Sequence, residues 1–156
     1  MTAPNARLII AGGGLSGCLA ALALAERRPD VDFLIVEGGE RFGGNHVWSF
    51  FDADVAGPER RLIEPLIGHR WSDHEVRFPQ RRRTLGFGYN SVRSADLDMR
   101  MRSTLAPGRY RLGSRIAQVG PDHVTLASGE RLAGAVVVDA RGAEPLPKLD
   151  LAWQKF

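Results

Sequence analysis

Residues 8–25 read LIIAGGGLSGCLAALALA and contain no charged side chain, although Arg7 precedes them and Glu26 follows. Three structures compete for this stretch: a membrane-spanning helix, a signal peptide, and a buried strand followed by a glycine-rich turn and a helix. The first two place four glycines inside one helix, where each costs roughly 1 kcal/mol relative to alanine. We therefore expect neither a transmembrane helix nor a signal peptide here.

In the third structure, a strand followed by a turn and a helix, each glycine has a structural role. The run ARLIIA at 6–11 is short and apolar, as a buried parallel strand is. A Gly-x-Gly-x-x-Gly spacing then fits a turn into a helix: the first glycine makes the turn, the second lets a pyrophosphate approach, and the third lets helix and strand pack closely. Free N–H groups at the start of that helix can hold phosphate. The predicted phosphate-binding turn comprises Gly12, Gly13, Gly14, Leu15, Ser16 and Gly17.

A second strand is predicted where the chain reads VDFLIVE, and it ends at Glu37, twenty residues beyond Gly17. At this place dinucleotide-binding folds have a carboxylate that binds the ribose hydroxyls. An acid rather than an arginine favours an unphosphorylated adenosine ribose, as in FAD or NAD. The sequence therefore predicts an α/β, Rossmann-like FAD/NAD(P)-binding domain with a parallel sheet.

The composition excludes several other classes of protein. Of the 156 residues, 44% are hydrophobic and 25% are charged, as in a soluble globular domain. The net charge of +3 comes without a basic stripe interleaved with aromatic residues, so we expect no nucleic-acid partner. Cys18 is the single cysteine and the four histidines lack metal-ligand spacing, so we expect no disulfide and no metal site.

Later segments resemble the glutathione-reductase-like flavoproteins. Arg41, Gly43 and Gly44 resemble the loop that runs close to the dinucleotide in that superfamily; the alternative is an ordinary glycine-rich turn. The run AGAVVVDARG at 133–142 reads as another buried strand and resembles the one that returns beside the flavin. Short runs within residues 110–134 resemble the β-meander inserted before that strand. The returning strand contributes Asp139, Arg141 and Gly142 to the predicted cofactor site.

Three runs narrow the resemblance further: GGNHVWSF at 43–50, RWSDHEVRFPQRRRTLGFGY at 70–89 and VVVDARG at 136–142. Together they resemble the bacterial lycopene β-cyclases of carotenoid synthesis, in order and along nearly all of the chain. The resemblance implies an enzyme that closes the ψ-ends of lycopene into β-rings without net redox change. It also implies reduced FAD as cofactor and NAD(P)H as reductant, and a chemistry that needs a carbon-protonating acid and an apolar pocket.

The resemblance places Asn45, His46 and Trp48 near the flavin or the mouth of the substrate site. The structural alternative is a loop histidine and a packing tryptophan, because tryptophan is commonly buried. The relatives are much longer, so the resemblance puts the catalytic acid beyond Phe156 and leaves no catalytic residue to name within the chain. We therefore expect a truncated enzyme with little cyclase activity of its own.

Four segments follow from this interpretation: residues 1–69 as the FAD-binding unit, 70–93 as the start of a substrate-facing sheet, 94–142 as the return to the FAD-binding domain, and 143–156 as a stub of the substrate domain. The run SADLDMRMRSTL predicts a helix capped by Ser94. Two alternatives remain for the whole chain. The first alternative is an FAD-dependent oxidoreductase or monooxygenase of the same superfamily. The second is a non-catalytic dinucleotide-binding remnant.

Arg81, Arg82 and Arg83, with Arg77 nearby, form the densest run of positive charge in the sequence. Such a run is either a solvated strand face or a surface that contacts anionic lipid. Because neither a signal peptide nor a transmembrane helix is expected, we predict a cytoplasmic protein. Peripheral contact at the inner membrane surface is the alternative that would suit a carotenoid substrate.

Overall fold

A parallel sheet forms the centre of the structure, which is a computed structural model that describes residues 7–142. All neighbouring strands in this sheet run parallel, and Leu8 lies opposite Phe33 on one side and Val136 on the other. The strand order is β12 (Val136–Asp139), β1 (Leu8–Ala11), β2 (Phe33–Val36) and β8 (Tyr110–Arg111). The predicted α/β architecture with a parallel sheet is confirmed.

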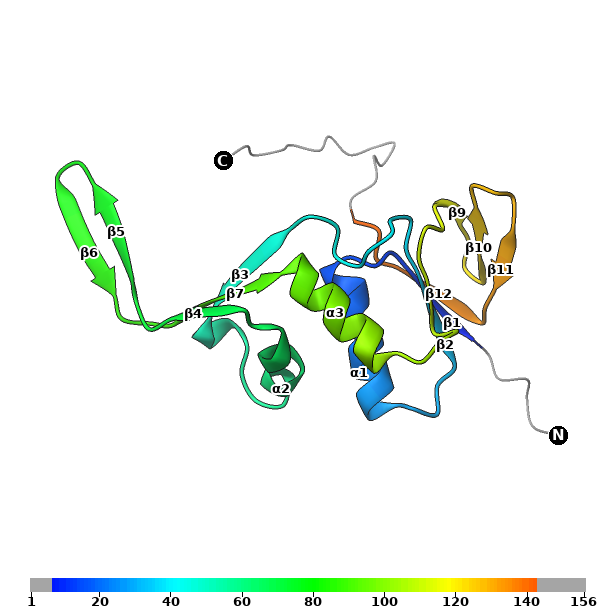
Figure 1. Ribbon diagram of the computed structural model, residues 1–156, viewed down its shortest axis with the longest axis horizontal. Coiled ribbons are helices and arrows are strands. Elements are labelled where there is room, and N and C mark those ends of the chain that lie inside the picture. The colour runs from blue at the N-terminus through cyan, green and yellow to red at the C-terminus, as the bar shows by residue number, and fades with distance from the viewer. Residues whose placement is uncertain (1–6, 143–156) are drawn as a thin grey trace.

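Two helices cover one face of this sheet, as Figure 1 shows. They are α1 (Leu15–Arg27) and α3 (Ser94–Thr104), which pack against each other. Cys18, Leu97 and Met101 from these helices are completely buried against Ile10 and Phe33 of the sheet. The helices can approach this closely because small residues, including four alanines, separate the leucines of α1.

A three-stranded antiparallel meander covers the other face of the sheet. It consists of β9 (Ile116–Val119), β10 (His123–Leu126) and β11 (Arg131–Ala133). Val124 and Leu126 pack on Ile9 and Leu34. Because β1 and β2 are thus covered on both faces, every residue that they place in the core is apolar, and their sequences read as continuous hydrophobic runs.

A second, antiparallel sheet extends from the helices and leads to a hairpin. Its order is β3 (Val47–Phe51), β7 (Tyr89–Arg93) and β4 (His69–Trp71), and the hairpin consists of β5 (His74–Phe78) and β6 (Arg81–Leu85). Between β3 and β4 lie a short helix, α2 (Glu59–Ile63), and two 3₁₀ turns, η1 (Asp52–Asp54) and η2 (Glu64–Leu66). This sheet takes strands from both the 1–69 and the 70–93 segments.

Three local predictions were wrong. Arg93, not Ser94, is the N-cap of α3, because β7 stays paired with β3 up to Arg93 and the helix begins directly after it. Tyr110 and Arg111 pair with β2 rather than with the meander. The strand that was expected to be buried, β12, leaves Val136 and Val138 47% and 43% exposed. As an edge strand it lies beyond α1 and α3, and no segment within 7–142 covers that face.

The predicted stub, residues 143–156, lies outside the described residues. Among the helices of residues 7–142, none combines the length and the apolar character needed to cross a membrane.

The close contact between α1 and β1 generates a stability prediction. A Cβ atom on Gly17 would lie 2.1 Å from the Gly12 carbonyl oxygen, whereas a Cβ atom on Gly14 would meet nothing within 4 Å. Although alanine normally stabilises a helix interior, we expect Gly17→Ala to lower the free energy of unfolding by about 2 kcal/mol or more through overpacking. Gly14→Ala should change it by less than about 1 kcal/mol. Urea denaturation followed by circular dichroism measures both, and equal stabilities would contradict the prediction.

Candidate functional site

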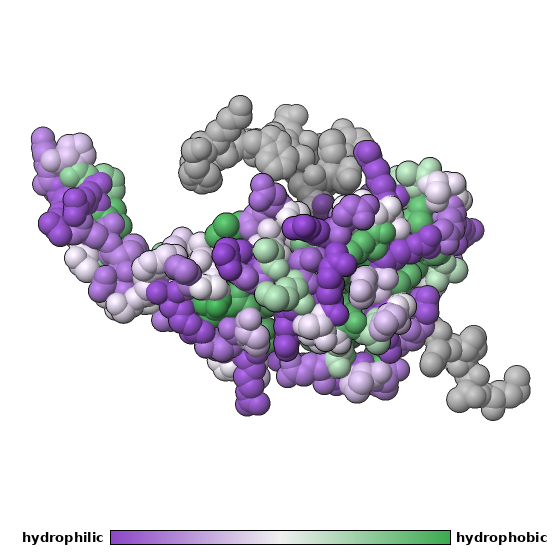
Figure 2. All heavy atoms as spheres, viewed as in Figure 1, coloured by the Kyte–Doolittle hydropathy of each residue, from purple (hydrophilic) through white to green (hydrophobic). Residues whose placement is uncertain are grey.

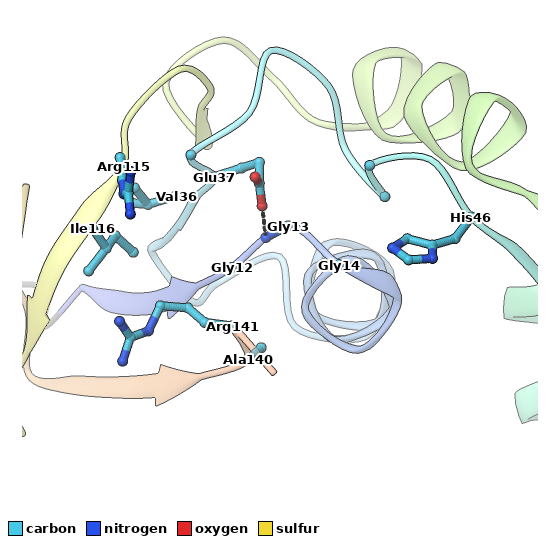
Figure 3. A pocket seen from close by; sticks show the side chains of 13 residues that line it. Gly12, Gly13, Gly14, Val36, Glu37, His46, Arg115, Ile116, Ala140 and Arg141 are labelled. Atoms are coloured by element: carbon cyan, nitrogen blue, oxygen red, sulfur yellow. Dashed lines mark hydrogen bonds between the residues drawn. The ribbon is translucent and has the colours of Figure 1, made fainter. Parts of the chain in front are cut away.

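A cleft of about 350 Å³ opens at the carboxyl ends of β1 and β2 (Figure 3). In open parallel sheets, ligands bind at this edge, where the connections from neighbouring strands diverge. Five segments line the cleft: the turn after β1, the end of β2, the loop before β3, the start of β9 and the end of β12. Its lining residues are Gly12, Gly13, Gly14, Val36, Glu37, Gly38, Gly43, Gly44, His46, Arg115, Ile116, Ala140 and Arg141.

The floor of the cleft is the glycine-rich turn between β1 and α1. Gly12 has a φ of +107°, which L-residues rarely adopt, and its position would bring a Cβ atom to 2.7 Å from the Ala140 carbonyl oxygen. Gly14 is the N-cap of α1 and has open space where a side chain would be. Because α1 begins without a side-chain cap and without an acidic residue in its first turn, its terminal N–H groups are available to an anion.

Glu37 stands directly beside this turn, as the sequence predicted. Its carboxylate accepts a hydrogen bond of 2.6 Å from the Gly13 N–H and another of 2.7 Å from the Gly39 N–H. Figure 3 shows the carboxylate aimed at the turn from the end of β2. A carboxylate has about four acceptor positions. Two of them hold the backbone here, and the others can accept hydrogen bonds from hydroxyl groups of a ligand.

The loop before β3 closes the opposite side of the cleft. The Gly43 N–H donates a hydrogen bond of 2.7 Å to the Gly13 carbonyl, which ties this loop to the floor. A Cβ atom on Gly43 would lie 3.0 Å from Trp48 Cη2, so the loop can pass this close to the tryptophan only as glycine. His46 lies at the far end of the cleft, with its ring 5.7 Å from that of Trp48.

A second cleft of about 400 Å³ adjoins the first and shares Ala140 with it. The Arg141 guanidinium donates two hydrogen bonds, of 2.9 and 2.8 Å, to the Asp139 carboxylate. These bonds hold the pKa of Asp139 below its usual value, although desolvation opposes the shift. The lining combines the start of α1 with the end of β12: Ser16, Gly17, Ala20, Val138, Asp139, Ala140 and Gly142.

The remaining predicted residues lie elsewhere. Arg41 and Asn45 are exposed and line neither cleft. Leu15 and Trp48 line an apolar cavity of about 180 Å³ between α1 and β3, and Trp48 packs against the hydrophobic core. Within residues 7–142, no cluster of His, Cys, Asp and Glu side chains could hold a metal ion.

The meander contributes two residues to the cleft that were not predicted from the sequence. Arg115 and Ile116 reach the cleft because β9 begins beside Glu37, where the Ser114 N–H donates to the Glu37 carbonyl at 2.8 Å. The side chain of Arg115 forms no ion pair within the described part of the chain. In the sequence, Arg115 is only a basic residue at the start of a predicted strand. That position does not reveal which end of the parallel sheet the meander will contact.

An aromatic cluster lies on the second sheet, where the hairpin begins. Phe51 and His74 stack with ring centres 5.4 Å apart, and Phe87 meets both rings edge-on. Tyr89 continues the contacts toward Trp71. The Nδ1 atom of His74 is buried and has no hydrogen-bond partner. Trp71 and Phe87 are partly exposed, so the cluster presents aromatic surface to solvent.

Comparison with known sequences identifies relatives along almost the whole chain. Residues 7–156 match the family model described as "Lycopene cyclase protein". The chain is 36% identical to a lycopene beta-cyclase of Pseudescherichia vulneris over 96% of its length, 34% identical to one of Pantoea ananas over 98%, and 37% identical to one of a Paracoccus species over 96%. It covers only 38–40% of the length of these relatives.

Solved structures share the fold at low sequence identity. A 2-methyl-3-hydroxypyridine-5-carboxylic acid oxygenase superposes with a TM-score of 0.65 at 18% identity, over 86% of this chain and 39% of that one. A 2,6-dihydroxypyridine-3-hydroxylase from Arthrobacter nicotinovorans gives 0.58 at 17% identity, over 86% and 36%. HpxO from Klebsiella pneumoniae, solved in complex with FAD, gives 0.57 at 15%, over 85% and 38%. These likenesses show that the chain shares the fold of these proteins.

The single thiol supplies a test of the packing beneath the cleft. Burial, followed by the negative charges of Glu37 and Asp98, raises the pKa of Cys18 to about 12. The thiol therefore stays protonated below that pH, and only the thiolate reacts. At pH 8 we expect iodoacetamide to label the folded protein about a thousandfold more slowly than the urea-unfolded protein. Intact mass gives both rates, and similar rates would show that Cys18 is accessible in the folded state.

Proposed function

Because this chain belongs to the lycopene cyclase family, we propose that it is the FAD-binding part of a lycopene β-cyclase. The reaction converts the ψ-ends of lycopene into β-rings and leaves the oxidation state of the carotenoid unchanged. Reduced FAD is the proposed cofactor and NAD(P)H its proposed reductant. The relatives extend beyond the matched region, and we propose that the acid that protonates the substrate lies in that remainder.

One observation carries the proposal: Glu37 holds the Gly13 N–H at the base of a cleft that is open above Gly14. The exposed N–H groups at the start of α1 would bind the diphosphate of FAD. The free acceptor positions of Glu37 would bind the hydroxyls of the adenosine ribose. Arg115 and Ile116 line the same end of the cleft as Glu37 and would contact the adenine.

The flavin would then extend along the loop before β3, toward His46. When bound and reduced, FAD supplies negative charge that stabilises a carbocation in an adjacent apolar pocket. The chain itself contributes Gly43 and Gly44, which allow a planar group to approach the backbone, and the Asp139–Arg141 pair, which fixes the end of β12. The reaction begins with proton addition to a terminal double bond and ends with proton loss, so no electrons are transferred.

The aromatic cluster supports an apolar polyene as the substrate. Phe51, Phe87 and Trp71 offer ring faces at the end of β3 that is remote from the cleft. Aromatic faces attract both conjugated hydrocarbons and positive charge. A hydrocarbon of this kind resides in lipid, so the proposal includes peripheral contact between the protein and a membrane.

A second function, FAD-dependent hydroxylation, is favoured by the oxygenases and hydroxylases among the solved structures of similar fold. Those structures are less than 25% identical to this chain, and one fold of this kind supports many reactions. The sequence relatives, at 34–37% identity, favour the cyclase. A remnant without cofactor binding is the remaining alternative, and a flavin titration separates it from both enzymes.

The titration measures the change in flavin fluorescence as the chain is added to FAD, with Glu37→Gln and Glu40→Gln as matched variants. We expect saturable binding by the wild type and a loss of about 10- to 100-fold in Glu37→Gln, because a hydrogen bond to a charged group is removed. Glu40 lines neither cleft, so its variant should bind normally. FMN, which has no adenosine, should not distinguish the variants. Absence of FAD binding by the wild type would contradict the proposal.

A second titration tests the adenine end of the cleft. Replacing Arg115 by alanine should weaken FAD about fivefold, because the guanidinium would lie over the adenine ring. Arg131→Ala removes the same charge from an exposed position outside both clefts and should leave the affinity for FAD unchanged. Equal effects of the two substitutions would indicate a general influence of charge rather than a contact of Arg115.

A further inference from the structure

The β5–β6 hairpin extends away from the rest of the protein, beyond the second sheet (Figure 1). Its antiparallel register places Phe78 opposite Arg81, Val76 opposite Arg83, and Arg77 opposite Arg82. Residues directly opposite each other in an antiparallel pair point to the same face, and faces alternate along each strand. The hairpin therefore has two faces of different composition.

The charge of one face is partly neutralised by an acidic residue on that face. Glu75, on this face, forms ion pairs with both Arg77 and Arg82. The other face carries Arg81 and Arg83, and neither forms an ion pair with any residue between 7 and 142. Two free guanidinium groups are thus gathered on one side of the hairpin.

The charge of the hairpin accounts for the charge of the whole chain. Residues 74–85 contain four arginines and one glutamate, a net charge of +3, which equals the formal net charge of +3 for all 156 residues. The rest of the sequence is therefore neutral on balance. Long-range attraction to an anionic surface would act through this hairpin and orient the molecule with the hairpin foremost.

Each free arginine lies opposite an apolar residue, Arg81 opposite Phe78 and Arg83 opposite Val76. Phe78 is 67% exposed, and Val76 is next to it on the same face. Figure 2 shows hydrophobic residues among the hydrophilic ones on the projecting hairpin. Arginines beside an exposed aromatic ring match the interface of a membrane, where the cations contact the headgroups and the ring enters the acyl boundary.

We propose that the face of the hairpin formed by Val76, Phe78, Arg81 and Arg83 binds the surface of an anionic lipid membrane. Membrane binding would give the protein access to a polyene dissolved in lipid, and this purpose rests on the proposed function. The binding itself depends only on the hairpin. Anionic headgroups are the partner because the face presents cations without counter-ions together with an apolar residue that water does not favour.

Co-sedimentation of the full chain with phosphatidylcholine vesicles, with and without phosphatidylglycerol, tests this proposal. We compare the double variant Arg81→Gln, Arg83→Gln with the double variant Arg77→Gln, Arg82→Gln, which removes the same charge from the opposite face. At about fivefold per arginine, the first should weaken binding to anionic vesicles about 25-fold. The second should weaken it much less. Phe78→Ser should weaken binding at every salt concentration, whereas raised salt should mainly weaken the contribution of the arginines.

Several results would overturn the proposal. Equal losses in the two double variants would show attraction by net charge alone, without a defined face. Undiminished binding to neutral vesicles, or no binding to anionic ones, would exclude anionic lipid as the partner. Concentration-dependent self-association that disappears in Arg81→Gln, Arg83→Gln would assign the face to a second copy of the chain.

The flavin titration, repeated on the hairpin variants, separates this proposal from the proposed function. Unchanged FAD binding in Arg81→Gln, Arg83→Gln shows that the variant is folded and that the lost vesicle binding is specific. Vesicle binding by a wild type that fails to bind FAD would remove the proposed function and leave the lipid surface in place.

Discussion

The contact between Gly17 and the Gly12 carbonyl fixes the rest of the structure. Any Cβ atom at Gly17 would lie 2.1 Å from that oxygen, so the first turn of α1 can sit against the end of β1 only without one. Gly12 in turn lies so close to the Ala140 carbonyl oxygen that a Cβ atom on Gly12 would be 2.7 Å from it. The end of β1, the start of α1 and the distant end of β12 therefore meet at one point, and the end of β12 is placed by its contact with the turn.

Gly13 extends this constraint to the walls of the cleft. Its N–H is held by the Glu37 carboxylate, and its carbonyl accepts the Gly43 N–H and the Cys18 thiol. The wall from β2 and the wall from the loop before β3 are thus attached to a single residue of the floor. The cleft is consequently shaped before any ligand enters, and less conformational entropy remains to be lost on binding.

The sequence allowed the prediction of those parts of the fold whose determinants are local. The turn and the strand ending at Glu37 were visible because their glycine spacing and apolar runs reflect contacts within thirty residues. Arg115 was missed because its place depends on how the meander docks on the far face of the sheet. The exposure of Val138 was missed for a related reason: an apolar strand reads alike at the centre and at the edge of a sheet.

β3 physically connects the two regions to which we assign functions. It begins directly after the loop that carries His46, and it ends at Phe51 in the aromatic cluster beside the hairpin. Val47 and Phe51 are separated by four residue steps, or about 13 Å along the strand. An extended polyene is long enough to reach from one region to the other. A protein that binds lipid through its hairpin would therefore hold the aromatic cluster nearer the membrane and the cofactor cleft farther from it.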